Sequence, residues 1–367
     1  MNDELLYQLA LTLVPNVGDV QAKLLIKQFG DARSVFKAKR STLEKVEGLT
    51  APALNSLKEF NDFSIAEKEL SFIDKYRIKT LFVTDPSYPQ RLLNCFDAPV
   101  LLFFKGTANL NVSKVISIVG TRSYTEYGKQ FTEKLVSDLA SHDVMVISGL
   151  AYGIDSIAHK AALKNNLSTV GVVGHGLDMI YPPENTNMAK EMISQNGGIL
   201  SEFFSKTIPD KHHFPLRNRI VAGMSDATIV VETLIKGGSM ITAKLADSYN
   251  RDVFAVPGRA IDKTSSGCNH LIKHNRAILL TDASDLLEVM GWKEKKRSGA
   301  KKQRQLFIEL TPEERQIVDM LQDRESVAID EINLRSGLSS STIAAAILNL
   351  ELQNVILSMP GKMYKLC

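Results

Sequence analysis

Short apolar runs alternate with amphipathic segments through the middle of the chain. The runs are rich in valine and isoleucine and fall at residues 115–120, 144–149, 169–174, 197–202, 227–231 and 252–258. Helix-periodic segments separate several of them, at residues 126–141, 154–164 and 184–195. Strands that are apolar at nearly every position are typical of a parallel sheet covered by helices on both faces. The pattern therefore predicts an α/β protein with a doubly wound, mostly parallel sheet.

The N-terminal third shows a different pattern. Residues 14–30 and 46–57 each place a glycine-containing turn before an apolar-periodic helix, as in a helix-hairpin-helix pair. The turn amides of such a hairpin can bind a phosphate, but the same helices can equally form a packed core. A helix over 62–79, a strand over 80–83 and the apolar run 100–104 then predict an extra edge of the sheet.

The C-terminal pattern predicts a winged helix. Helices are expected over 312–321, 329–336 and 342–353, followed by a hairpin. The candidate recognition helix, STIAAAILNLELQ, contains no lysine or arginine, and residues 306–367 carry nine acidic and five basic side chains. Because DNA binding needs cations, we expect this domain to contact protein instead.

A basic segment, KEKKRSGAKKQRQ, precedes the winged helix. It is expected to be a linker, with electrostatic contact to a nucleic acid strand as the alternative. The predicted domains are a helical helix-hairpin-helix or SAM-like domain over 1–64, the sheet domain over 65–292, the linker over 293–306 and the winged helix over 307–367.

Composition narrows the class of protein. The 367 residues are 44% hydrophobic and 23% charged, as in soluble globular proteins. No apolar run approaches the length of a membrane span, and the acidic start lacks the basic region of a signal peptide. Three distant cysteines fit free thiols in a reducing compartment. We therefore expect a cytoplasmic protein without a membrane partner. The net charge is only +3, so any nucleic-acid footprint must be local.

The stretch from residue 211 to 242, KHHFPLRNRIVAGMSDATIVVETLIKGGSMIT, concentrates the candidate chemistry. Pro215 is expected to open a helix, whose free backbone N–H groups favour anions. Arg217 and Arg219 lie two positions apart and therefore face nearly opposite ways, so one is expected to bind the ligand and the other to brace the fold. Gly237, Gly238 and Ser239 form a turn whose amides can approach a phosphate.

Glycine turns end almost every strand, at Gly120, Gly149, Gly174, Gly238 and Gly258. Ligands of open parallel sheets bind at the carboxyl ends of the strands, so these turns converge on one rim. Neither GxxxxGK[ST] nor a complete GxGxxG is present, and no nucleotide cofactor is expected. Arg122, Lys211, Arg217 and Arg219, with Phe214 as a stacking ring, suit a phosphodiester chain or a single phosphorylated metabolite.

Two further groups of residues resemble functional sites. Cys268, His270 and His274 have the character of metal ligands, but no partner pair completes a site, and no metal is expected. Asp155 and His159 are spaced like an acid–base pair. We favour the alternative that Asp155 accepts backbone N–H groups at a helix start, and we expect no catalytic residue.

Five ordered motifs carry a family resemblance. They are VGTRSYTEYG at 119–128, SGLAYGIDSIAHKAAL at 148–163, HHFPLRNRIVAG at 212–223, GGSMITAKLA at 237–246 and FAVPG at 254–258. Together they closely resemble the DprA/Smf family. The resemblance implies an extended Rossmann-like domain that binds incoming single-stranded DNA during natural transformation, protects it and helps to load the RecA recombinase. It also implies a homodimer and no established catalytic reaction.

The resemblance implies roles for individual residues. Arg122 and Lys211 would bind the DNA backbone, and Phe214 would stack on a base. The two-residue spacing described above makes Arg219 the expected bracing member of its pair. The expected DNA-binding set is Gly120, Arg122, Lys211, Phe214, Arg217, Asn218, Arg219, Gly238, Ser239 and Thr242. Leu271 and Ile272, in the element SSGCNHLI, are the expected exposed contacts of a dimer, with packing at the sheet edge as the alternative.

One enzymatic alternative shares this type of sheet. The Lonely Guy phosphoribohydrolases process nucleotides and carry a PGGxGTxxE motif. The chain reads KGGSMITAKLA at the corresponding turn, without that proline or glutamate. A third alternative is a scaffold that binds only proteins, which predicts no retention of single strands at moderate salt.

Overall fold

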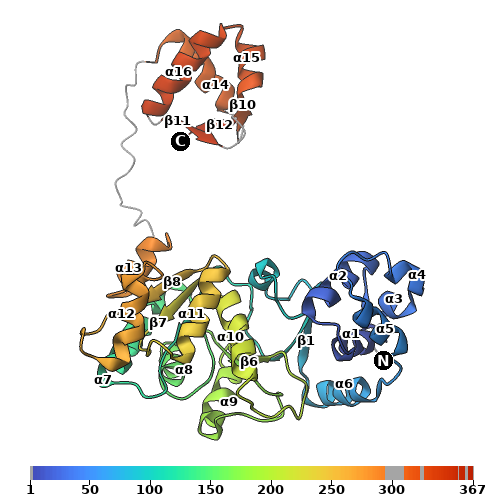
Figure 1. The fold of residues 1–367 in the computed structure, drawn as a ribbon. Helices are drawn as coiled ribbons and strands as arrows, with labels where there is room; N and C mark the ends of the chain where they lie inside the picture. The colour runs from blue at the N-terminus through green and yellow to red at the C-terminus, as the bar shows by residue number, and fades with distance from the viewer. Residues whose placement is uncertain (1–2, 294–309, 323–325, 354, 360–362, 367) are drawn as a thin grey trace. The chain divides into compact units, whose positions relative to one another are not determined.

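The computed structural model describes residues 3–293, 310–322, 326–353, 355–359 and 363–366 (Figure 1). They form two compact units that divide between Lys293 and Glu294. Apart from Lys293, the predicted linker over 293–306 lies outside the described residues. The two units are described separately below.

A nine-stranded sheet in the order β1-β2-β6-β5-β4-β3-β7-β8-β9 forms the centre of the first unit, within its described residues. The seven strands from β6 to β9 pair in parallel, and β1 and β2 extend the β6 edge in antiparallel pairing. This confirms the predicted doubly wound sheet with its extra edge. The strands are β1 (Lys79–Phe82), β2 (Leu101–Gly106), β3 (Val115–Val119), β4 (Met145–Ser148), β5 (Thr169–Val173), β6 (Gly198–Ser201), β7 (Ala227–Val230), β8 (Asp252–Ala255) and β9 (Ile278–Leu279).

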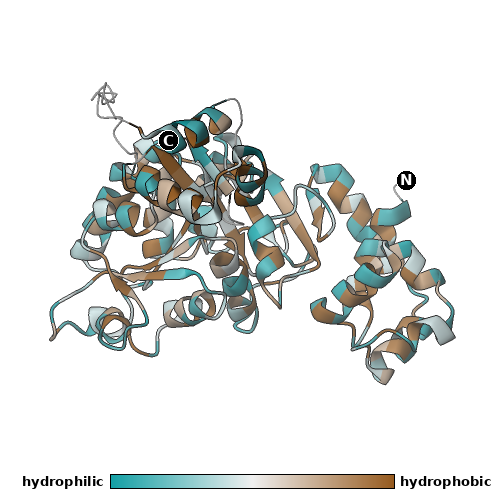
Figure 2. Cartoon of the chain, turned by 90° about the horizontal axis from the view of Figure 1, so that it is seen from above, coloured by the Kyte–Doolittle hydropathy of each residue, from teal (hydrophilic) through white to brown (hydrophobic). Residues whose placement is uncertain are grey.

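Helices cover the sheet through separate apolar clusters. One cluster joins β3 and β8 to α7, α8 and α13 through buried Ile118, Val136 and Leu286. Another joins the sheet to α10, α11 and α12 through Val221, Met240 and other side chains. In Figure 2 the strands are mainly brown and the helices carry both colours, as amphipathic helices should. These helices are α7 (Glu126–Asp138), α8 (Ile154–Lys164), α9 (Thr186–Ser194), α10 (His213–Gly223), α11 (Gly238–Ser248), α12 (Ser266–Lys273) and α13 (Ala283–Val289), with 3-10 helices at Gln90–Asn94, Ala140–His142, Pro183–Asn185 and Lys263–Ser265.

The N-terminal helices pack on the outer strands of the same unit. Their core includes Phe82, Leu101 and Phe103 from β1 and β2 as well as apolar side chains of the helices. The predicted boundary at residue 64 therefore falls at the start of α6, inside one continuous core. The helices are α1 (Asp3–Leu13), α2 (Asp19–Phe29), α3 (Ala32–Lys37), α4 (Arg40–Leu43), α5 (Ala51–Glu59) and α6 (Ser64–Tyr76).

The first turn of α2 faces the sheet. The Asp19 carboxylate accepts the Val100 backbone N–H at 2.9 Å, and Lys23 donates to the Phe96 carbonyl at 2.9 Å. Helices α2 and α5 follow the two glycine-containing turns, as the helix-hairpin-helix pattern predicts. Contact of this module with DNA stays a prediction.

The second unit has the helix and strand order of a winged helix, as predicted. Its first helix begins with a capping box, in which Thr311 and Glu314 cap each other's backbone N–H groups. The three short strands pair antiparallel in the order β10-β12-β11. The elements are α14 (Pro312–Leu321), β10 (Val327–Ala328), α15 (Ile329–Ser336), α16 (Ser340–Leu352), β11 (Ile356–Met359) and β12 (Met363–Leu366).

Membrane insertion was not expected from the sequence. Among the helices of the described residues, none combines the length and the apolar character that crossing a bilayer requires.

Candidate nucleic-acid interface

The loops that follow β3, β4 and β7 meet the first turns of α10 and enclose a cleft of about 340 Å³. The β3 loop packs directly on α8, because a Cβ at Gly120 would lie 2.5 Å from the Ile154 side chain. The first residue of α11 is open instead, since a Cβ at Gly238 would have no neighbour within 4 Å. A ligand can therefore approach the backbone at the start of α11 closely.

Most of the predicted DNA-binding residues line this cleft. Those brought together are Gly120, Arg122, Phe214, Arg217, Asn218, Gly238, Ser239 and Thr242. Lys211 and Arg219 are not among the lining residues. Lys211 is exposed on the loop before α10, and Arg219 is buried on another side of that helix.

Arg122 and Phe214 lie side by side in the wall of the cleft. The Arg122 guanidinium carbon lies 5.5 Å from the centre of the partly exposed Phe214 ring. Across the described residues this guanidinium takes part in no ion pair or hydrogen bond. A cation held only by an aromatic ring can move to a phosphate at low cost.

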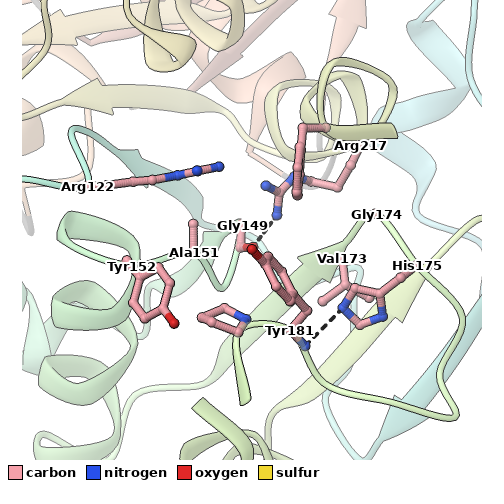
Figure 3. A pocket seen from close by; sticks show the side chains of 11 residues that line it. Arg122, Gly149, Ala151, Tyr152, Val173, Gly174, His175, Tyr181 and Arg217 are labelled. Atoms are coloured by element: carbon pink, nitrogen blue, oxygen red, sulfur yellow. Dashed lines mark hydrogen bonds between the residues drawn. The ribbon is translucent and has the colours of Figure 1, made fainter. Parts of the chain in front are cut away.

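Arg217 lies beneath the same ring, with its guanidinium carbon 5.9 Å from the ring centre. Its side chain is buried, and Nη1 donates to the Gly149 carbonyl oxygen (Figure 3). Nη1 also donates to the Val172 carbonyl oxygen, so Arg217 bridges the ends of β4 and β5. Burial lowers the pKa of Arg217 to about 10, against the attraction of Asp155, so the group stays charged at neutral pH. Arg217 therefore places a fixed positive charge under the cleft.

Arg219 projects from a different side of α10 than Arg217, as the two-residue spacing predicts. Its guanidinium forms ion pairs with Asp19 of α2, at 3.1 Å, and with Glu202 after β6. Burial raises the pKa of Glu202 to about 7, while Arg219 acts to lower it. Both arginines thus brace the fold, and of the two only Arg217 also lines the cleft.

Asp155 lies at the start of α8, where its Oδ2 accepts the Gly149 N–H at 3.0 Å and the Ala151 N–H at 3.4 Å. Burial raises the pKa of this carboxyl, and Arg217 opposes the shift. His159 is fully buried, with Nδ1 2.7 Å from the Thr169 hydroxyl, and burial lowers its pKa to about 3. Asp155 thus accepts backbone N–H groups of the loop before its helix start, as predicted, and His159 belongs to the core.

The other predicted residues lie near α12. Leu271 is only 4% exposed and packs in the core, so the expectation that it is exposed was wrong, and Ile272 is half-buried. Leu271 points inward because it lies on the apolar face of an amphipathic helix. The Cys268 thiol is buried against the carbonyl oxygens of Val230 and Val231, and burial raises its pKa to about 12.

A second, smaller pocket adjoins the cleft and shares Arg122, Phe214 and Arg217 with it (Figure 3). Its other walls include Tyr152 and Tyr181, which the sequence reasoning missed. A signal was present, since Tyr152 follows the glycine turn after β4 and Tyr181 lies in the loop after β5. Aromatic residues in the strand-end loops therefore mark the rim as well as the cations do.

Gly153, the residue before α8, lies against the backbone of the loop that follows β3. Its φ is +82°, and a Cβ would lie 2.2 Å from the Thr121 carbonyl oxygen. We expect Gly153→Ala to lower the free energy of unfolding by about 1–3 kcal/mol, because the loop must shift as well as accept the strain. Gly291→Ala is the matched control, since it has φ +64° and no neighbour within 4 Å. Equal losses in urea unfolding of the two variants would contradict this reason.

Known proteins resemble this chain over most of its length. The family profile described as DNA recombination-mediator protein A matches residues 79–291, and the DprA winged helix domain matches residues 302–362. Protein Smf of Synechocystis sp. is 32% identical over 401 aligned residues, which cover 99% of both chains.

Solved structures agree with the sequence matches. The X-ray structure of DNA processing protein A (DprA) from Streptococcus pneumoniae has a TM-score of 0.66 and 33% identity, over 78% of this chain and 98% of that chain. A structure of the Helicobacter pylori protein, described for its single-stranded DNA binding mode, has a TM-score of 0.53 and 32% identity, over 58% and 95% of the two chains. Since the first profile spans more than half of the residues and the Synechocystis relative matches end to end, the chain belongs to the DNA recombination-mediator protein A family, whose members include DprA and Smf proteins.

Proposed function

We propose that this protein binds single-stranded DNA in the cleft at the carboxyl ends of the strands. The observation that carries the proposal is Arg122, an exposed cation that contacts a partly exposed aromatic ring beside an open helix N-terminus. A single strand offers the two groups that such a site needs, a phosphate for the cation and an unpaired base for the ring.

The backbone of the strand would lie along the glycine turns. Arg122 and the first amides of α11 bind phosphates, and neither contact depends on the sequence of the DNA. Phe214 takes the face of a base. Lys211 lies outside the cleft wall on the loop before α10 and binds the strand where it leaves the cleft.

Membership of the family supports a wider role. The Helicobacter pylori relative is described as binding single-stranded DNA, which supports the same ligand for this chain. We propose that the protein acts in the cytoplasm as a homodimer, protects incoming single strands during natural transformation and loads RecA onto them. In this proposal it is a mediator that catalyses no reaction.

Removing the side chains of Arg122 and Lys211 should weaken the binding of single strands of any sequence. We expect Arg122→Ala with Lys211→Ala to lower the affinity for a labelled oligonucleotide by roughly 10- to 100-fold at low salt. The plot of log affinity against log salt should become shallower, its negative slope losing about 1.4 in magnitude, because two fewer phosphate contacts release fewer counterions. Fluorescence anisotropy at several ionic strengths measures both quantities.

The charge-matched control is Lys134→Ala with Lys164→Ala, since both lysines are exposed and lie on α7 and α8 away from the cleft wall. Equal affinities of the two double variants would refute the site. If the wild-type protein retains no single strand, the function itself is refuted. Release of free base from nucleoside monophosphates would favour the phosphoribohydrolase alternative.

A further inference from the structure

The loop that carries Arg122 is hydrogen-bonded at both ends to one residue, Glu232. Before Arg122, the Thr121 N–H donates to the Glu232 carbonyl oxygen at 2.7 Å. After it, Thr125 donates its backbone N–H to Glu232 Oε2 at 2.9 Å and its hydroxyl to Oε1 at 2.5 Å. Glu232 follows β7 and is only 1% exposed. A single buried residue at the end of the neighbouring strand therefore holds both ends of this loop.

The start of α7 leaves room for the Glu232 carboxylate. A Cβ at Gly128 would overlap Glu232 Oε2, so a residue without a side chain lies against the carboxylate. The Gly128 N–H also donates to the Thr125 hydroxyl at 3.2 Å, and this leaves the hydroxyl proton for Glu232. Within the described part of the chain, both hydrogen bonds of the carboxylate go to Thr125, at the far end of the Arg122 loop.

Arg122 depends on this backbone for its position. Its guanidinium contacts the Phe214 ring and, across the described residues, takes part in no ion pair or hydrogen bond that could hold it. The backbone of the loop therefore sets the point from which the arginine reaches the cleft. At the Thr121 end the loop is also bound to α8, because the Thr121 carbonyl accepts the Ile154 N–H at 3.2 Å. At the Thr125 end the Glu232 carboxylate provides the contact with the sheet.

We propose that Glu232 is a positioning residue, which holds the loop after β3 so that Arg122 meets a phosphate of the single strand. This inference rests on the proposed function and adds to it a residue that acts through another. Glu232 does not line the cleft. It lines a second hollow of about 1100 Å³, which has no lining residue in common with the cleft. Its effect on bound DNA must therefore pass through the loop, which loses less freedom on binding when both of its ends are held.

The charge of Glu232 and its hydrogen bonds predict opposite results for Glu232→Ala. A carboxylate near a phosphate site repels the phosphate, so loss of the charge alone would strengthen binding. Loss of the bonds to Thr125 releases the loop, and we expect the affinity for a labelled oligonucleotide to fall by about 3- to 10-fold. The negative slope of log affinity against log salt should also lose up to about 0.7 in magnitude, the share of one phosphate contact. Fluorescence anisotropy at several ionic strengths measures both quantities.

Double variants show whether Glu232 acts through Arg122. Glu232→Ala should have no further effect on affinity in an Arg122→Ala background, and its full effect should remain in a Lys211→Ala background. Hydrogen exchange gives a second readout on the free protein. The amides of residues 121–125 should exchange faster in Glu232→Ala than in the wild-type protein, because the Thr125 N–H has lost its acceptor.

Thr125→Val tests the same contact without a change in charge. It removes the hydroxyl and should lower the affinity by less than Glu232→Ala does, whereas Thr125→Ser should bind like the wild-type protein. Asp285→Ala is the matched control, because Asp285 accepts the backbone N–H and the hydroxyl of Thr281, at 2.8 Å and 2.6 Å, and neither residue lines the cleft. Its affinity should equal that of the wild-type protein. Thermal melting checks that each variant is folded, and Thr125→Val carries the test if Glu232→Ala is not.

The outcomes separate the two proposals. If Glu232→Ala binds single strands as tightly as the wild-type protein or more tightly, or if it weakens the Arg122→Ala variant further, the positioning role is refuted and single-strand binding stands. Equal affinities of Thr125→Val and Thr125→Ser lead to the same conclusion. If the wild-type protein retains no single strand, both proposals fail.

Discussion

Replacing Arg219 with alanine should lower the free energy of unfolding by about 3–5 kcal/mol, because it leaves the buried Glu202 carboxylate without its cation. Glu202 and Asp19 both pair with this guanidinium, and the Arg219 and Glu202 side chains are only 8% and 11% exposed. Chemical denaturation at neutral pH measures the loss. Arg259→Ala is the control, since Arg259 is exposed and takes part in no ion pair among the described residues.

The loss should depend on pH. Burial already raises the pKa of Glu202 to about 7 although Arg219 acts against it, so removing Arg219 raises that pKa further. A carboxyl whose pKa is raised by folding favours the folded state at low pH, and this contribution is lost as the pH rises through the folded-state pKa. Arg219→Ala should therefore be less destabilised, relative to the wild-type protein, at pH 5 than at pH 8. Identical losses at the two pH values would show that Glu202 is not the group left unpaired.

Arg217→Ala should also cost about 3–5 kcal/mol of unfolding free energy. The variant loses the bonds from Nη1 to two strand-end carbonyls and leaves the buried Asp155 carboxylate without its nearby cation. The ends of β4 and β5 are then no longer bridged beneath the cleft, so single-strand affinity should fall as well.

Arg122→Ala provides the contrast for this prediction. Its guanidinium is exposed, so the variant should lose affinity while its melting temperature changes little. Arg217→Lys should fall between the wild-type protein and Arg217→Ala, because an ammonium keeps the charge but cannot reproduce the planar fork. A stable Arg217→Ala protein that had lost only affinity would contradict the bracing role.

The sequence predicted the elements of the sheet closely. Apolar runs identified the strands because a buried parallel strand has no polar face, and the helix predicted over 154–164 begins and ends at the observed residues. The helix predicted to start at Pro215 starts at His213 instead. The backbone N–H groups in the first turn of a helix have no partner within the helix, and this is the group that proline lacks. A helix therefore tolerates proline at its third position as well as at its first.

The sequence predicted which residues make up the site better than it predicted the directions of their side chains. Glycine turns and cations indicated which loops meet, but the partners of Arg217 and Arg219 lie far away in sequence, at Gly149, Val172 and Asp19. No spacing rule reveals such pairs, so the sequence could not show that both guanidinium groups turn inward. The inward position of Leu271 was missed because a short amphipathic helix at a sheet edge can present either face.

The shared core of the N-terminal helices and the outer strands limits where the protein can be shortened. A truncated protein that begins at residue 65 would uncover Phe82, Leu101 and Phe103, and it would remove one carboxylate from Arg219. Newly exposed apolar side chains on an edge of the sheet favour aggregation. A truncation after Lys293 leaves that core whole, so it is the safer way to isolate the unit that holds the candidate cleft.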